Sequence, residues 1–97
     1  MIISFRNRGV EDIFDGQSTR AAQRACPQML WPRARRKLDQ INRVRNLRDL
    51  NIPPGNSLKR LRGDRAGQHS IRVNAQYRIC FRWESGYAHE VEIIDYH

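Results

Sequence analysis

Long apolar runs and clustered cysteines are both missing from this chain of 97 residues. No stretch approaches the ~18 consecutive apolar residues of a membrane span, and residues 1–10 lack the features of a secretory signal. The two cysteines, Cys26 and Cys80, form no CxxC motif and no Cys/His cluster. Zinc needs about four well-spaced ligands, and small secreted scaffolds usually carry more cysteines. We therefore expect a cytoplasmic protein with two free thiols, no metal, no cofactor and no membrane contact.

A second hydrophobic core does not fit into this length, because independent domains rarely fall much below ~50 residues. Apolar residues make up 39% of the chain, which suits one modest core. The sequence therefore predicts a single domain over residues 1–97.

Acidic residues are scarce relative to basic ones. Eighteen Lys and Arg residues against ten Asp and Glu give a net charge of +8, and only two of the eighteen are lysine. Residues 20–65 carry a net charge of +10, whereas residues 83–97 carry −4. A domain this basic attracts anionic partners, above all nucleic acid, and guanidinium groups fork onto phosphate oxygens. An Arg-preferring genome is an alternative reason for the Arg/Lys ratio, but it does not explain the net charge.

Two different periodicities divide the chain into a helical half and a sheet half. The first half has apolar residues three and four positions apart, and the second alternates apolar with polar residues. The segment 17–27 is weakly periodic and reads as a loop or a second short helix. The expected elements are a strand at 2–5, helices at 9–16 and 29–44, and strands at 58–61, 68–73, 76–84 and 89–96. This order, a strand and two helices followed by a meander of antiparallel strands, predicts an α+β fold, a small antiparallel sheet with helices packed on one face.

Basic residues recur on the polar side of the expected strands. Arg72, Arg78 and Arg82 fall on the parity opposite to the apolar residues, which would place a row of guanidinium groups across an open face. Ordinary solvated strand exteriors explain the same pattern equally well. More cations in the preceding segment favour the binding face; they are Lys59, Arg60, Arg62 and Arg65.

Short motifs in the second half follow one another in the order of a known family. They are Pro53-Pro54-Gly55-Asn56, Leu61-Arg62-Gly63-Asp64-Arg65, Ser70-Ile71-Arg72-Val73-Asn74, Tyr77-Arg78-Ile79-Cys80-Phe81 and Asp95-Tyr96-His97. In this order they resemble the HigB-type killer toxins of bacterial toxin–antitoxin modules, a branch of the RelE superfamily. The resemblance is specific over about the last half of the chain and looser before it.

The resemblance implies a ribosome-dependent endoribonuclease that enters the ribosomal A site of the 70S ribosome and cuts mRNA there. It also implies a cognate antitoxin, a helix-turn-helix protein similar to HigA, through which alone the toxin reaches operator DNA. The implied RelE-like fold is a small antiparallel sheet flanked by helices, which agrees with the order of elements above.

The expected chemistry is attack of the ribose 2′-OH on the adjacent phosphate, since no metal-ligand set is visible. This route needs a base, an acid and cations for the phosphorane. His97 is the only histidine at a position that the resemblance implies is catalytic, and imidazole titrates near neutral pH, so it is the first choice for proton transfer, with Asp95 and Tyr96 orienting it or sharing the proton. Lys59 stands where some relatives carry histidine, and an amine with a pKa near ~10.4 is a poor base but a good cation.

The remaining site residues follow from the matched positions. Arg78 matches the family's strand arginine and would bind the scissile phosphate, and Arg62 matches a basic position. The residues expected at the catalytic site are His97, Tyr96, Asp95, Arg78, Lys59 and Arg62. Those expected to contact RNA are Arg65, Arg72, Arg60 and Arg82.

Plainer interpretations stay open for several of these residues. His69, His89 and the basic stretch 33–37 suit ordinary surface or core roles, with an rRNA or antitoxin contact as the second interpretation of the stretch. Strict alternation from Val91 and Ile93 also puts Asp95 and His97 on the buried parity. A β-bulge, or a strand ending before Asp95, must release them if they act on substrate. The rival class of function is a basic nucleic-acid-binding or interaction module without catalysis.

Overall fold

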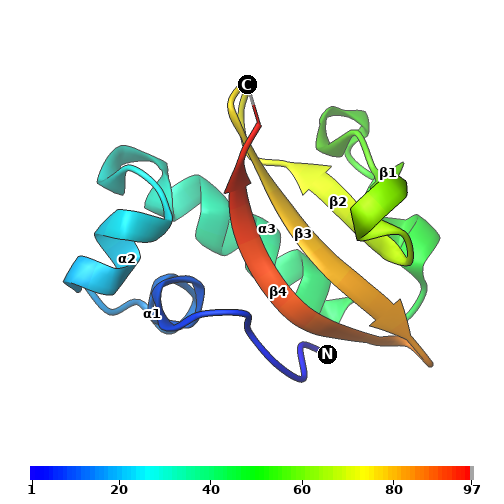
Figure 1. Ribbon diagram of the computed structural model, residues 1–97, viewed down its shortest axis with the longest axis horizontal. Coiled ribbons are helices and arrows are strands. Elements are labelled where there is room, and N and C mark those ends of the chain that lie inside the picture. Colours follow the sequence, from blue (N-terminus) through cyan, green and yellow to red (C-terminus); the bar gives the residue numbers. More distant parts are fainter. Residues whose placement is uncertain (97) are drawn as a thin grey trace.

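Three α-helices precede a four-stranded antiparallel sheet in the computed structural model, which describes residues 1–96 (Figure 1). The helices are α1 (Arg8–Asp15), α2 (Arg20–Ala25) and α3 (Trp31–Arg43), and the strands are β1 (Lys59–Arg60), β2 (Gln68–Arg72), β3 (Tyr77–Glu84) and β4 (Tyr87–Asp95). Short 3-10 turns are η1 (Gln28–Leu30), η2 (Leu47–Asn51), η3 (Pro54–Asn56) and η4 (Gly63–Arg65). The expected α+β class, with helices first and an antiparallel sheet after them, is confirmed.

Capping residues set the limits of the helices. Asn7 accepts a hydrogen bond from the Val10 amide at the start of α1, and Gly16 ends this helix with a φ of 77°. Thr19 caps α2 in the same way. The segment 17–27, for which a loop and a short helix were both possible, therefore contains a helix. The structure therefore has three α-helices among its described residues where the overall order predicted two.

The predicted strand at residues 2–5 is wrong. This segment runs parallel to β4, but it forms only two isolated bridges, Ile2 to Ala88 and Phe5 to Val91. The pairing is interrupted at Glu90, whose φ is 53° and whose amide donates to the Ser4 hydroxyl instead of a backbone carbonyl. A continuous hydrogen-bond ladder cannot pass such a residue. Residues 2–5 therefore lie along the edge of β4 without forming a regular strand.

The sheet has the simple order β1-β2-β3-β4, as expected for a meander. The observed strands lie close to their predicted ranges, with β2 ending at Arg72 because Val73 and Asn74 already belong to the turn. Between Cys80 and Arg82 the register shifts, so Phe81 faces both Glu90 and Val91. This two-against-one arrangement is a β-bulge in β4.

The core lies between α3 and the sheet. Ala34, Leu38 and Ile41 recur on one side of α3 and are fully buried, together with Ile79 and Phe81 of β3. In Figure 1 the helix passes behind the strands, while α1 and α2 extend the helical layer beyond β4. The helices therefore cover one face of the sheet, as predicted.

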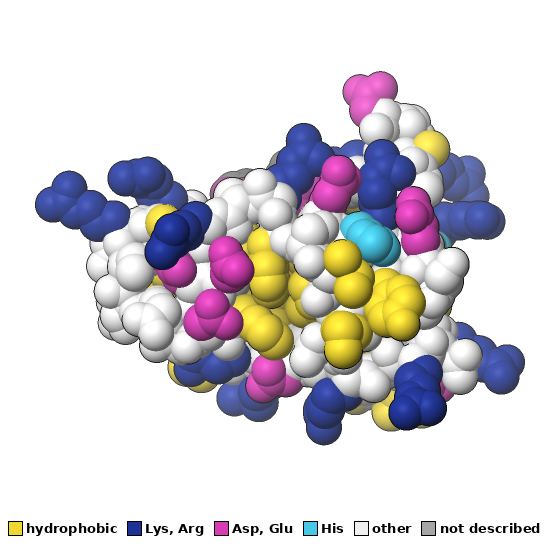
Figure 2. All heavy atoms as spheres, turned by 90° about the horizontal axis from the view of Figure 1, so that it is seen from below, with side chains coloured by type: hydrophobic (Ala, Val, Ile, Leu, Met, Phe, Trp, Pro, Cys, Tyr) yellow, Lys and Arg dark blue, Asp and Glu magenta, His cyan; other side chains and the backbone are white. Residues whose placement is uncertain are grey.

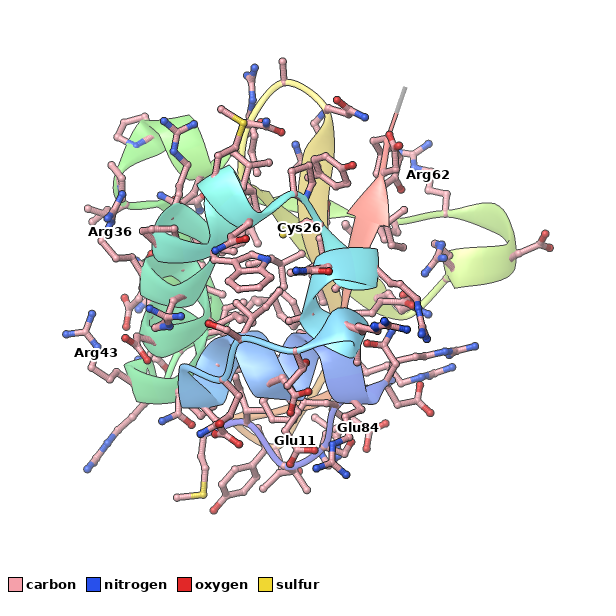
Figure 3. All side chains as sticks on the ribbon, turned by 90° about the vertical axis from the view of Figure 1, so that its left-hand side faces the viewer. Glu11, Cys26, Arg36, Arg43, Arg62 and Glu84 are labelled. Atoms are coloured by element: carbon pink, nitrogen blue, oxygen red, sulfur yellow. The ribbon has the colours of Figure 1, made fainter. Side chains whose placement is uncertain are left out.

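The opposite face is less open than predicted. Ser70 and Cys80 are fully buried there, and Arg78 is 9% exposed. The reason is that residues 57–68 fold over this face, and Figure 3 shows the segment with Arg62 on the side of the sheet away from α3. This segment, together with β2 and β3, frames the candidate site.

Exposed apolar side chains collect at one end of the molecule. Figure 2 shows this end, where yellow side chains lie next to several acidic ones. Met1, Ile3 and Tyr87 are among the exposed large hydrophobic residues. No helix in the described part of the chain is both long and apolar enough to cross a membrane.

Candidate active site

Arg78 lies near the start of β3 and its guanidinium is buried. Nε donates to the Ser70 hydroxyl at 2.8 Å, and Nη2 donates to the backbone carbonyls of Ser70, at 3.3 Å, and of Ser57. Burial lowers the pKa of Arg78 from its usual value, because a desolvated charge is costly. The other terminal nitrogen, Nη1, has no acceptor among the described residues, so it can bind an external anion.

Strand register places two more cations on the same face. Arg72 is directly opposite Arg78 on the neighbouring strand, and Lys59 is opposite Ser70 on the strand beyond it. Directly paired residues of antiparallel strands share a face. Both Arg72 and Lys59 are exposed. The structure therefore brings these three predicted residues together on one face of the sheet.

Arg65 reaches over the same face from η4. Its Nη1 donates to Glu92 of β4 at 2.7 Å and to the Gln68 side chain at 3.1 Å. The hydrogen bond that Arg65 donates to Glu92 is the main cause that raises the pKa of Arg65. Glu92 is opposite Cys80 and so has the parity of Arg78. The pair closes one side of the site and partly neutralises Arg65.

The other predicted arginines lie farther from this group. Arg60 is opposite His69, so it has the parity of the helix-covered face. Burial, and then the charge of Arg60, lower the pKa of His69. Arg82 donates to Glu90 at 3.0 Å, four residues along β3 from Arg78. Arg72, Arg78 and Arg82 share one face by register, as predicted, but the buried Cys80 lies between Arg78 and Arg82, and Arg82 is paired with Glu90.

Arg62 is exposed and directly precedes η4. It belongs to the segment that folds over the Arg78 face, and Figure 3 shows its side chain projecting outward on this side. It carries no ion pair among the described residues. Its charge is available to a ligand that approaches this rim.

Asp95 ends β4 and accepts a hydrogen bond from the Gln76 side chain at 3.1 Å. It is opposite Tyr77 and keeps the parity of Ile93, because the bulge lies upstream at Glu90 and Val91. Neither of the two expected ways of moving Asp95 off the buried parity therefore applies. The bulge does not change the parity of Asp95, and the strand does not end before this residue. The carboxylate is nevertheless exposed, since the core does not extend to this end of the strand.

Tyr96 follows the last strand residue and is 41% exposed. Its amide donates to the Gln76 carbonyl at 2.6 Å. Ile94 is opposite Arg78, so Tyr96, two residues further on, continues the parity of Arg78. His97 lies outside the described residues.

Sequence reasoning missed the residues that hold the cations in place. Ser70 and Glu92 were not selected, although their alternation with the apolar positions already placed them on the face of Arg78. The acceptor at Ser57 leaves no signal in the sequence because it is a backbone carbonyl. Among residues 1–96, no group of three or more His, Cys, Asp or Glu side chains could hold a metal ion.

Residues 3–97 match the model of a protein family described as HigB-like toxins, RelE-like toxins of the type II toxin–antitoxin system HigB. The chain belongs to the HigB-like toxin family. The resemblance found in the sequence motifs is thereby confirmed.

Relatives of known name agree with this membership. Toxin HigB-1 of Vibrio cholerae is 34% identical over 88 residues, which cover 91% of this chain and 90% of that protein. Endoribonuclease HigB of Proteus vulgaris is 31% identical over 97 residues, the full length of both chains. The match with the Proteus vulgaris relative spans the whole of this HigB-like chain and so includes the strands that carry the candidate site.

Solved structures of toxin–antitoxin complexes show the same fold. The YoeB–YefM complex of Staphylococcus aureus superposes with a TM-score of 0.53 at 10% identity, covering all of this chain and 98% of that one. A heterotetrameric YoeB–YefM complex of the same organism gives 0.54. At this identity the likeness concerns the fold of the HigB-like chain alone.

Removing the Ser70 hydroxyl should destabilise the protein. Ser70→Ala leaves a buried guanidinium donor without its acceptor, which typically costs about 1–3 kcal/mol. Urea unfolding followed by circular dichroism measures this loss. Ser18→Ala is the matched control, because Ser18 is exposed in a loop. Equal stabilities of the two variants would show that the Ser70 hydroxyl does not stabilise Arg78.

Proposed function

We propose that this chain is a ribosome-dependent mRNA endoribonuclease, the toxin of a toxin–antitoxin pair. The observation that carries the proposal is the cationic group of Arg78, Arg72 and Lys59 on one face of the sheet. Tyr96, at the end of β4, continues the parity of Arg78, and the HigB-like relative in Proteus vulgaris is named an endoribonuclease. A phosphate on this face would meet several donors at once.

The cations are proposed to bind the scissile phosphate and its developing negative charge. Arg78 is the central donor, because its backbone and serine contacts hold the side chain in place while Nη1 has no acceptor among the described residues. Lys59 and Arg62 add charge from β1 and the following segment. Preorganised donors of this kind lose little free energy to reorganisation during the reaction.

Proton transfer is proposed for the end of β4. The ribose 2′-OH loses its proton as it attacks the phosphorus, and the leaving 5′-oxygen gains one, which yields a cyclic phosphate and a 5′-hydroxyl. An imidazole can give or take a proton near neutral pH, so His97 suits either role. Asp95 and Tyr96 are the neighbouring groups that can orient the imidazole or share the proton. The reaction needs no metal in this scheme.

RNA contacts outside the scissile phosphate are proposed for Arg72 and Arg65, with Arg60 and Arg82 farther out. Arg65 is held by Glu92 in the free protein, so RNA must compete with this carboxylate. An incoming phosphate is a stronger partner than a single carboxylate when other cations surround it. We therefore expect Arg65 to exchange Glu92 for RNA on binding.

The proposed partners are the 70S ribosome with its mRNA and a cognate antitoxin of the helix-turn-helix type. Operator DNA would be reached only through the antitoxin. Translated mRNA is present in the cytoplasm, which is the compartment in which the toxin would act.

Cleavage should depend on translation. In a reconstituted translation system, purified protein should cut an mRNA inside its reading frame and leave the same mRNA intact without ribosomes. Primer extension maps the cuts. Equal cleavage of naked mRNA would contradict ribosome dependence. The absence of any cleavage would favour the module that binds without catalysis.

Arg78→Ala should lower single-turnover cleavage on programmed ribosomes by about 10²–10³, the usual effect of removing one donor to a developing oxyanion. Arg78→Lys should recover little, because it keeps the charge without the forked geometry. Since Arg78 is buried and bonded, each variant is first compared with wild type in urea unfolding. A folded alanine variant with full activity would remove Arg78 from the site.

His97→Gln should lower the same rate by about 10²–10⁴, as expected for the loss of a proton-transfer group, without changing the unfolding midpoint. Tyr96→Phe is the companion variant, which keeps the ring and removes only the hydroxyl. If His97→Gln stays within a few-fold of wild type and Tyr96→Phe does not, the proton is carried by the phenol. Rates between pH 5 and 9 distinguish the two groups, since imidazole and phenol titrate about three units apart.

A further inference from the structure

A groove of about 770 Å³ lies on the other side of the molecule from Arg62, along the exposed side of α3. The residues of η3 and the turn between β2 and β3 form its remaining walls. Arg33 donates to the Val73 carbonyl at 3.5 Å, which ties the helix to the turn. Five cations line the groove: Arg33, Arg36, Lys37, Arg43 and Arg72.

No acidic residue lines the groove among the described residues, and none of its five cations takes part in an ion pair there. Burial lowers the pKa of Lys37, and the charges of Arg36 and Arg33 lower it further. This crowding is unfavourable in the free protein. An anion with several charges in a row would relieve it.

The pattern of the lining suits a phosphate backbone. Arg33, Arg36 and Arg43 recur along one side of α3 over about 15 Å, at 1.5 Å per residue. None of the described lining residues is aromatic, so the groove has no platform on which unpaired bases could stack. Double-helical RNA is recognised mainly through its shape, its phosphates and its 2′-hydroxyls. Protein partners often dock on large aromatic anchors, and none lines this groove; its apolar lining is limited to small or medium-sized side chains, Pro53, Val73 and Ala75.

The groove is separate from the candidate active site but continuous with it. Figure 3 shows Arg36 and Arg43 projecting from α3 on one side of the molecule and Arg62 on the other. Arg72 belongs to both surfaces, because it lines the groove and is directly opposite Arg78 in the sheet. RNA held in the groove would therefore lie beside the strand that is cut.

We propose that the α3 groove binds the backbone of double-helical RNA and so holds the toxin on structured RNA next to its substrate. The inference rests on the proposed function in naming RNA as the partner. It assigns Arg33, Arg36, Lys37 and Arg43 to a surface that no step of the cleavage reaction uses.

Charge reversal on α3 tests the groove. Arg36→Glu with Arg43→Glu is compared with Arg20→Glu plus Arg24→Glu, two exposed arginines of α2 that change the net charge equally. The probes are a 2′-O-methyl RNA hairpin of about 16 base pairs, the span of a known class of duplex readers, and a 2′-O-methyl single strand. Neither probe can be cleaved, because the attacking hydroxyl is blocked. Affinity is measured by fluorescence anisotropy across a salt series.

The groove variant should bind the hairpin about tenfold or more weakly, and its slope of log affinity against log salt should be shallower by about two. The α2 variant should lose much less affinity for the hairpin. The affinity of the groove variant for the single strand should fall less than its affinity for the hairpin. Equal losses for the two variants, or for the two probes, would overturn the proposal. Arg36→Gln with Arg43→Gln repeats the measurement if the glutamates unfold the protein.

Two further measurements distinguish failure of the groove proposal from failure of the proposed function. If the groove variant loses affinity for the purified antitoxin but not for the hairpin, the groove is a protein-docking surface and the proposal is wrong. Wild-type cleavage of translated mRNA is measured in parallel. Hairpin binding that depends on the groove in a protein without nuclease activity would refute the proposed function and leave the RNA groove standing.

Discussion

A buried guanidinium must have its hydrogen bonds satisfied, and the site depends on how Arg78 meets this requirement. A charge removed from water without partners costs several kcal/mol. Ser70 supplies two acceptors from the adjacent strand, and the Ser57 carbonyl supplies a third from the segment before β1. The contacts that make burial tolerable therefore also join that segment to the sheet. They orient the guanidinium before any ligand arrives, which is what an oxyanion site requires.

The sheet could be predicted from the sequence because alternation is a local property. The strands from Gln68 to Asp95 appear where the period of two predicts them, and Arg72 stands beside Arg78 as their parity requires. The bulge could not be predicted, since it needs a positive φ at Glu90, a conformation that glutamate rarely adopts. Glu90 also limits the pairing of residues 2–5. Its backbone conformation therefore explains why the strand predicted at residues 2–5 does not form.

Residues close in sequence were assigned to one site, and the pleat separates some of them. Lys59 and Arg60 are neighbours in β1, but their side chains belong to opposite faces of the sheet. The contact between Arg65 and Glu92 spans 27 positions and depends on the path of the η4 segment. Long-range pairs of this kind carry no periodic signal. The positions of the cations along the chain can be read from the sequence. Only the strand register shows which of their side chains share a face and can act together.

The distribution of carboxylates decides where the net charge of +8 is felt. Five ion pairs use Glu90, Glu92 or Asp12, which lie near the N-terminal segment and in β4. These carboxylates neutralise arginines on their own side of the molecule, such as Arg82. The cations of α3 take part in none of these ion pairs. The carboxylates near the end of the sequence offset the positive charge around β4. The positive potential is therefore strongest at α3 and the rim of the sheet, where a polyanion would bind.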